Sequence, residues 1–212
     1  ALNPVIEKRL VYDVYACREG KGSHLAVSRL DHFMRSCSHN YQNEGWVLKL
    51  DIRSFFMSID KHLLFAAFGS YIRASYFEQD RELLLKLCQL VVSNDPTYDC
   101  IFRSPYSSWD RLPRDKSLFY AKQGCGLPIG NLTSQVFANF YLSSLDHFIK
   151  HNLGIRFYGR YVDDFVLVHE SRHYLVECIR HIRQFLQTEL HLELHPKKIR
   201  LQRICHGVSF LG

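Results

Sequence analysis

Two adjacent aspartates, Asp163 and Asp164, lie between apolar segments in RFYGRYVDDFVLV. An Asp-Asp pair in a turn often has only a structural role, because aspartate tolerates turn backbones and bonds its own main chain. Here the flanking segments are typical of strands, so the turn would present two neighbouring anions at the edge of a packed sheet. Carboxylates this close resist joint ionisation unless a cation neutralises them. A hard divalent cation with oxygen ligands is the natural candidate.

Asp51 offers a third carboxylate at the end of the apolar segment WVLKLD. An exposed polar residue at a strand end is unremarkable on its own. Central strands, however, bring distant parts of a chain together, and such pairing would place Asp51 beside the Asp163–Asp164 turn. Three carboxylates at one sheet edge can hold two Mg²⁺ ions about 3.5–4 Å apart, which activate a 3′-hydroxyl and stabilise a leaving pyrophosphate. A two-metal site is therefore our hypothesis for these residues.

Hydrophobic periodicity and capping residues predict the elements that would position this site. Helices are predicted over residues 23–37, 61–68, 79–92, 133–150 and 171–188. Strands are predicted over residues 46–52, 155–161, 165–169 and 191–195, with a closing hairpin from 199–204 and 208–211. Asp60 and Ser171 are the expected N-caps of two helices. The helix over 79–92 carries Leu83, Leu84, Leu87, Leu90 and Val91.

From Trp46 onward the order is strand, helices, strand pair, helix, strand. This order indicates an α+β fold with a small, mainly antiparallel sheet and helices packed on one face. Residues 94–126 are interrupted by Pro and Gly and are expected to be loop or irregular hairpin. Basic and aromatic residues mix between Arg103 and Lys122, an arrangement that suits a nucleic-acid path and equally a loop pinned by its aromatic rings.

Composition limits the class of protein. Of the 212 residues, 47% are hydrophobic and 23% are charged, which excludes a disordered or collagen-like chain. No apolar run approaches the roughly 18 residues that span a bilayer, so no membrane partner is expected. Seven scattered cysteines without a CxxC pair favour neither a zinc site nor a disulfide framework, and the cytoplasm is the expected compartment. The net charge of +6 suits a polyanionic partner without identifying one.

Four blocks together resemble the reverse transcriptase family: KLDIRSFFMSID, GLPIGNLTSQVFANFYL, YVDD, and LELHPKKIR with GVSFLG. They follow the family's order, and YDVYACREGKGSHLAVSRL resembles a fingers-to-palm block of bacterial enzymes related to those of group II introns. The resemblance implies a right-hand polymerase palm with part of the fingers. Partial fingers are expected over residues 1–45, and the palm over 46–212 with a fingers-type insertion at about 94–126. We expect the chain to be a fragment that lacks the thumb.

The resemblance also implies roles for individual residues. Asp51, Asp163 and Asp164 match the catalytic, metal-binding aspartates, with Ile52 as a further metal-binding position. Two Mg²⁺ ions are the implied cofactors, with Mn²⁺ as an alternative.

Other matches concern the nucleotide and the primer. Phe56 matches the gate residue that packs under the sugar and excludes a 2′-hydroxyl, which would favour dNTPs. Lys198 matches a catalytic lysine that lies near the triphosphate and protonates pyrophosphate, with Lys197 as the adjacent alternative. The other implied nucleotide-binding residues are Arg53, Ser54, Phe55, Ile129, Gly130, Asn131 and Gln135, and the implied primer grip is Phe210, Leu211 and Gly212.

The block GLPIGNLTSQ departs from most reverse transcriptases, which have Gln-Gly and later Ser-Pro. In this chain Ile129 precedes Gly130, and Gln135 follows Ser134. The form resembles the enzymes of diversity-generating retroelements, which copy a template RNA with errors concentrated at adenines. A branched aliphatic side chain at position 129 cannot make the hydrogen bond of Gln, so altered nucleotide selection is physically plausible.

The implied function is RNA-directed DNA polymerisation, with error-prone cDNA synthesis in a diversity-generating retroelement as the favoured type. A group II intron, retron or phage-defence reverse transcriptase is one alternative, and a non-catalytic RNA-binding polymerase relic is another. The implied partners are template RNA, primer, cDNA, dNTPs and a small basic accessory protein.

Overall fold

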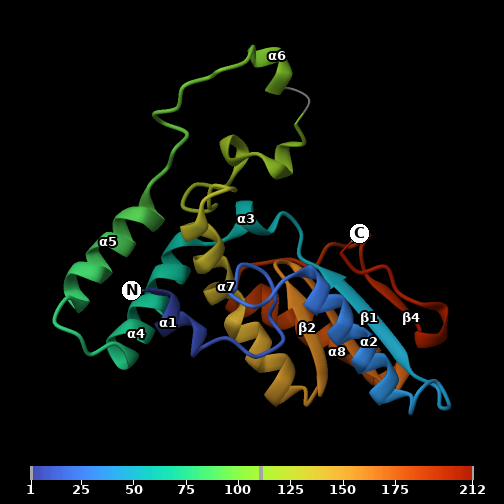
Figure 1. Cartoon of the computed structure of the whole chain (residues 1–212). Coiled ribbons are helices and arrows are strands. Elements are labelled where there is room, and N and C mark those ends of the chain that lie inside the picture. The colour runs from blue at the N-terminus through green and yellow to red at the C-terminus, as the bar shows by residue number, and fades with distance from the viewer. Residues whose placement is uncertain (1, 110–111, 212) are drawn as a thin grey trace. The chain divides into compact units, whose positions relative to one another are not determined.

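A computed structural model describes residues 2–109 and 112–211 of the chain (Figure 1). The chain forms two compact units: one comprises the chain up to Lys8 together with Ser54–Tyr141, and the other comprises Arg9–Arg53 and Leu142–Gly212. The first unit is helical, and the second contains the sheet. None of the described helices is both long and apolar enough to cross a bilayer. The division into fingers and palm at residue 45 stays a prediction.

The sheet has four antiparallel strands in the order β2-β3-β1-β4. The strands are β1 (Trp46–Asp51), β2 (Phe157–Tyr161), β3 (Asp164–His169) and β4 (Arg200–Arg203). The same unit holds α2 (Ser23–Cys37), α8 (Arg172–Glu189), the end of α7 (Leu132–His147), a π turn (Phe148–Asn152) and a 3₁₀ turn (Ile204–His206). The prediction of α2 is confirmed at both ends, and Ser171 caps α8 as predicted by accepting from the Tyr174 amide.

Side-chain alternation along the strands separates the two faces of the sheet. Val47, Val166 and Val168 pack in one cluster with the buried residues of α2, which lies in front of the strands in Figure 1. Leu48 and Leu167 point to the opposite face and are fully buried. Because α8 contacts β1 and β3, it covers this second face. The expected helical cover of one face is therefore present, and α2 adds cover to part of the other.

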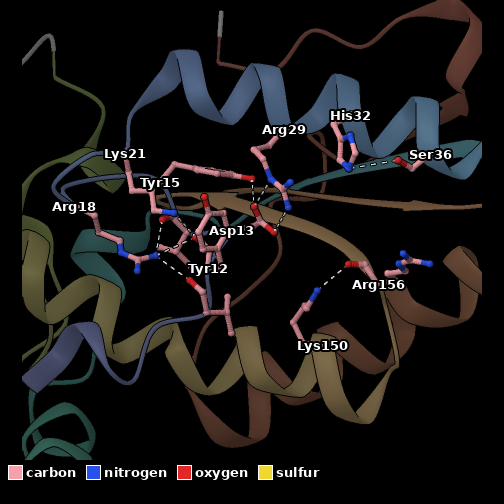
Figure 2. A network of polar contacts seen from close by, with 12 residues as sticks. Tyr12, Asp13, Tyr15, Arg18, Lys21, Arg29, His32, Ser36, Lys150 and Arg156 are labelled. Carbon is pink, nitrogen blue, oxygen red and sulfur yellow. Dashed lines mark hydrogen bonds and ion pairs between the residues drawn. The ribbon is translucent and has the colours of Figure 1, made fainter. Parts of the chain in front are cut away.

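A polar network ties the N-terminal segment of this unit to the sheet (Figure 2). Arg29 of α2 donates to both carboxylate oxygens of Asp13, at 2.8 and 3.0 Å, and the Tyr15 hydroxyl donates to the same carboxylate at 2.9 Å. Backbone hydrogen bonds join Asp13 and Tyr15 to Arg160 of β2. Gly159 makes room for this packing, since a Cβ there would lie 3.0 Å from the Tyr15 ring. The network thereby holds α2 against the strands.

The first unit contains α1 (Leu2–Glu7), α3 (Phe55–Ser58), α4 (Lys61–Ser75), α5 (Arg81–Ser93), α6 (Tyr106–Trp109), the start of α7 and two 3₁₀ turns (Arg114–Lys116 and Leu118–Tyr120). Asp60 caps α4 as predicted, because its carboxylate accepts from the amides of His62 and Leu63. Phe68 of α4 packs edge-on against Phe137 of α7, with ring centroids 5.3 Å apart. The described residues between 94 and 126 form short helical turns joined by loop, as the Pro and Gly content predicts.

The apolar residues of α5 are divided between buried and exposed positions. Leu85, Cys88 and Val92 are buried, whereas Leu83 and Leu87 are exposed. Both faces of this helix are apolar, so periodicity alone does not decide which face packs.

Two predictions near the C-terminal end are wrong. Residues 191–195 are not a strand: Leu194 forms an isolated bridge with Ile52, which follows β1, and the His195 amide donates to the Asp51 carbonyl. Pro196 follows directly and cannot donate to a ladder, which leaves too short a run for a strand. The closing hairpin does not form either, because β4 pairs with β1 and residues 208–211 have no strand conformation.

Candidate active site

The candidate carboxylates meet at one end of the sheet. Asp51 and Asp164 are directly opposed partners in β1 and β3. Asp163 lies in the turn just before β3, after Val162 at a φ of 56°. Asp51 is only 5% exposed, and its carbonyl accepts a hydrogen bond from the His195 amide at 2.8 Å. The antiparallel register therefore places side by side residues that are far apart in the chain.

Two lysines pair with these carboxylates. Lys198 Nζ donates to Asp51 Oδ2 at 2.8 Å, and this bond raises the pKa of Lys198. Lys49 Nζ lies 3.4 Å from Asp164 Oδ2. The sequence reasoning missed Lys49, although a lysine two residues before Asp51 in an apolar strand must share the face of Asp51.

Burial and mutual repulsion raise the pKa of two carboxyl groups. The pKa of Asp163 is raised to about 6, first by burial and then by the charge of Asp51. The pKa of Asp164 is also raised, chiefly by burial, although Lys49 opposes the change. Carboxyl groups that resist ionisation beside a third carboxylate are stabilised by an added cation.

The donor set fits a hard divalent cation, since it consists of three carboxylates. Within residues 2–109 and 112–211, no three carboxylate, histidine or cysteine side chains converge closely enough to hold one ion. Lys49 and Lys198 instead pair with two of the carboxylates, so a bound cation would replace their ammonium groups. Ile52 is buried in the core next to Asp51. Metal binding by these residues stays a prediction.

The turn that carries Asp163 has a buried support. Arg160 of β2 is fully buried, and its Nη1 donates to the Val162 carbonyl at 2.8 Å. Sequence reasoning missed this residue, although a single arginine within the apolar FYGRY segment was a signal for a buried ion pair. Arg160 holds the backbone immediately before Asp163.

The segment after Asp51 contains the first nucleotide-binding candidates. The Arg53 amide donates to the Glu193 carbonyl at 2.8 Å, and the Arg53 guanidinium lies 3.6 Å from the Glu193 carboxylate. In the helical unit, Ser54 has a φ of 49° and occupies the N-cap position before α3. Phe55 is buried, and Phe56 is half-buried, with its carbonyl accepting from the Leu127 amide at 2.8 Å. Within this unit, the hydrogen bond between Leu127 and Phe56 therefore joins residues 54–56 to residues 126–128.

The other nucleotide-binding candidates lie at the start of α7. Ile129 is 67% exposed, and Gly130 has a φ of 101° that a side chain would strain. The Asn131 carbonyl accepts from the Gln135 amide at 3.3 Å in the first helical turn. The exposed Ile129 side chain is accessible to a ligand, and the nucleotide-binding role of these residues stays a prediction.

The primer-grip candidates occupy the end of the described chain. Phe210 is buried in the cluster under α2, and its ring centroid lies 5.9 Å from Lys49 Nζ. Lys49 Nζ also donates to the Ser209 carbonyl at 3.4 Å. Leu211 is partly buried, and Gly212 lies outside the described residues.

Comparisons with known proteins agree with this geometry. The family described as reverse transcriptase (RNA-dependent DNA polymerase) matches residues 1–212. No curated protein matches the chain in sequence. Among solved structures, apo telomerase from Candida tropicalis truncated from its C-terminal domain is similar at a TM-score of 0.62 and 11% identity, covering 100% of this chain and 41% of its own.

Two further telomerase structures, each in complex with the TWJ fragment of telomeric RNA, are also similar. The Candida tropicalis protein has a TM-score of 0.64 and 12% identity, covering 99% of this chain and 34% of its own. The Candida albicans protein has a TM-score of 0.59 and 13% identity, covering 98% and 36%. At such identity the likeness shows the fold, and the chain spans less than half the length of these telomerases.

Proposed function

Because the chain belongs to the reverse transcriptase family, we propose that it adds deoxynucleotides to a primer 3′-hydroxyl on an RNA template. The observation that carries the proposal is the direct opposition of Asp51 and Asp164, with Asp163 in the adjoining turn. The family generally uses divalent metal ions, and these three residues would hold them. Bound ions would supply the charge that activates the 3′-hydroxyl and stabilises the leaving pyrophosphate.

The chain's own side chains prepare the reaction. Lys198 lies beside Asp51 and Lys49 lies beside Asp164, so each of these carboxylates has a cationic partner that a metal ion would replace. Lys198 carries a proton on Nζ next to Asp51, and this proton would pass to the leaving pyrophosphate. RNA as the template partner agrees with the similar telomerase structures that contain a telomeric RNA fragment.

The test is incorporation of dNTPs by the full-length protein on an RNA template annealed to a DNA primer, with Mg²⁺ and with EDTA. We expect Asp163→Asn to abolish metal-dependent extension. Asp31→Asn is the matched control, because Asp31 is an exposed carboxylate of α2 that pairs with Arg35 of the same helix and with Tyr41. Circular dichroism establishes that both variants fold. Near-wild-type extension by Asp163→Asn would refute the assignment, and tight RNA binding without any extension by the parent would favour the non-catalytic relic.

We further propose error-prone cDNA synthesis of the diversity-generating type, with its own template RNA, a small basic accessory protein and the cytoplasm as its compartment. The exposed Ile129 beside Gly130 supports this, because it offers no hydrogen bond to an incoming nucleotide. Sequencing the products tests it: errors should concentrate opposite adenine and decrease in Ile129→Gln. Faithful copying of adenine would favour a group II intron, retron or phage-defence enzyme.

A further inference from the structure

A cavity adjoins the carboxylates on the α2 face of the sheet. Its volume is about 450 Å³, and it is lined by Lys49, Asp51, Asp164, Lys198, Arg200, Gln202, Val208 and Ser209. Three of these side chains are cationic, and they come from β1, from β4 and from the segment before β4. Against the two carboxylates of the lining, Asp51 and Asp164, the cavity therefore has one cation in excess.

The cations of this cavity are not all compensated. Lys49 and Arg200 are directly opposed partners in β1 and β4, an arrangement that is unfavourable for like charges. Lys49 is paired with Asp164, and Lys198 is paired with Asp51. Within the described part of the chain, the Arg200 guanidinium has neither an ion pair nor a hydrogen bond. A bound anion would reduce the repulsion between Lys49 and Arg200 and would pair with the free guanidinium.

The polar residues of the lining form a row that runs along the strands away from the carboxylates. Arg200 lies opposite Lys49, two residues before Asp51, and Gln202 lies opposite Val47, four residues before Asp51. At about 3.3 Å per residue, the row extends roughly 13 Å from the carboxylates along the strands. This length matches a polymer that leads away from the reacting end better than a compact triphosphate.

We propose that Lys49, Arg200 and Gln202 form a binding row for the phosphodiester backbone of a nucleic-acid strand. The inference rests on the proposed function only in taking the carboxylates as the reacting end. The Arg200 guanidinium would form a bidentate contact to one phosphate. Lys49 would become available to a second phosphate once a cation replaces it on Asp164. The Gln202 amide already donates to the Gly207 carbonyl, and its second N–H would donate to the strand without adding charge.

Arg203 provides a matched control on the same strand. It lies opposite Trp46, so its side chain is on the other face of the sheet. Its guanidinium lies 3.2 Å from the Glu44 carboxylate and 5.5 Å from the Trp46 ring centroid. Removing this charge changes the protein's net charge as much as removing Arg200 does, but it leaves the cavity unchanged.

The experiment measures the affinity of the full-length protein for a labelled RNA–DNA primer–template duplex in EDTA, without dNTPs, at several salt concentrations. We expect Arg200→Gln to weaken binding and to reduce the slope of log K against log salt by about 1, whereas Arg203→Gln leaves the slope unchanged. Arg200→Lys should restore most of the slope. A slope for Arg200→Gln equal to that of the wild type, or an equal loss in Arg203→Gln, would overturn the proposal.

A second measurement separates a strand from a triphosphate. Arg200→Gln should raise the KM for the primer–template and leave the KM for dNTP unchanged. A raised KM for dNTP with unchanged duplex affinity would assign the cavity to the triphosphate and overturn the proposal. Because the binding experiment needs no extension, it can support the row even if Asp163→Asn refutes the polymerase assignment. If the wild-type enzyme extends primers and Arg200→Gln binds the duplex as the wild type does, the binding row is refuted and the proposed function is not.

Discussion

Arg160 and Asp146 form an ion pair in which neither side chain is exposed to solvent. Arg160 Nε and Nη2 each donate to an Asp146 carboxylate oxygen at 2.7 Å. Its Nη1 donates to the Val162 carbonyl, and the pair therefore connects the end of α7 to the turn before Asp163. A buried pair of this kind is costly to break but adds little over an apolar replacement. Its position beneath the turn indicates that it orients the candidate catalytic residue.

Replacing Arg160 alone should be strongly destabilising. In Arg160→Met the Asp146 carboxylate is left buried without its cation, and we expect the free energy of unfolding to fall by about 3–5 kcal/mol. Chemical denaturation followed by circular dichroism measures this loss. The double variant Arg160→Met with Asp146→Leu should recover much of the stability without recovering activity, because the Val162 carbonyl still lacks its donor. Full activity of the double variant would show that the pair has no positioning role.

The raised pKa of Asp163 predicts a pH-dependent metal requirement. Its pKa in the folded protein, about 6, lies above the usual value, so protons compete with the metal below that pH. The half-saturating Mg²⁺ concentration for extension should rise about tenfold per pH unit below about pH 6. Extension assays between about pH 5 and about pH 8 measure it. A constant Mg²⁺ requirement across this range would contradict the assignment of Asp163 as a metal-binding residue.

In the absence of metal, the raised pKa of Asp163 also determines how the stability of the folded protein changes with pH. The folded state binds the Asp163 proton more tightly than the unfolded state does, so this group lowers stability as the pH rises toward about 6. Asp163→Asn should remove that component and be no less stable than the wild type at neutral pH. Denaturation in EDTA checks this expectation, and a clear loss of stability in Asp163→Asn would contradict it.

Lys198 and Lys197 should differ in their effect on extension. The Lys198 ammonium group donates to the Asp51 carboxylate, whereas the backbone amide of Lys197 donates to the His195 ring. We expect Lys198→Gln to lower kcat by about 10²-fold or more, as loss of a general acid does, and Lys197→Gln to stay near the wild type. Single-turnover extension against pH compares them, and the alkaline limb should disappear only in Lys198→Gln. Equal losses of kcat in both variants would contradict the assignment of Lys198, rather than Lys197, as the general acid.

Phe56 should control the choice of sugar. Replacing it with Ala removes the ring that would occupy the space of a 2′-hydroxyl, and discrimination against ribonucleotides should fall by about 10–200-fold. The ratio of kcat/KM for dNTP and NTP measures this. Phe55→Ala is the control, because Phe55 is buried and its loss should lower stability by about 3–5 kcal/mol while leaving the ratio unchanged. A changed ratio in Phe55→Ala, with none in Phe56→Ala, would contradict the prediction.

The local sequence pattern was sufficient to predict several helices and strands. The apolar spacing of residues 23–37 predicts α2 at both ends, and Asp60 and Ser171 are recognisable as caps, because a cap bonds amides within its own first turn. The apolar runs around Asp51, Asp163 and Asp164 likewise predict β1 and the β2–β3 pair. Their roles as a catalytic set rest on the order of the family's blocks.

Other features were decided by the tertiary structure. Which face of α5 is buried depends on what packs against it, since the helix is apolar on both sides. The pairing of β4 with β1 rather than with residues 208–211 depends on competition between edges of the sheet. Lys49 and Arg200 became neighbours only through that register.

The sequence by itself determined the residue types that chemistry requires and the elements that carry them, because periodicity and capping act within a few residues. The tertiary structure alone decided which charges lie opposite each other, as in the pairing of Lys49 with Asp164 and of Arg160 with Asp146. Such pairing follows from strand register and burial, which join residues far apart in the chain.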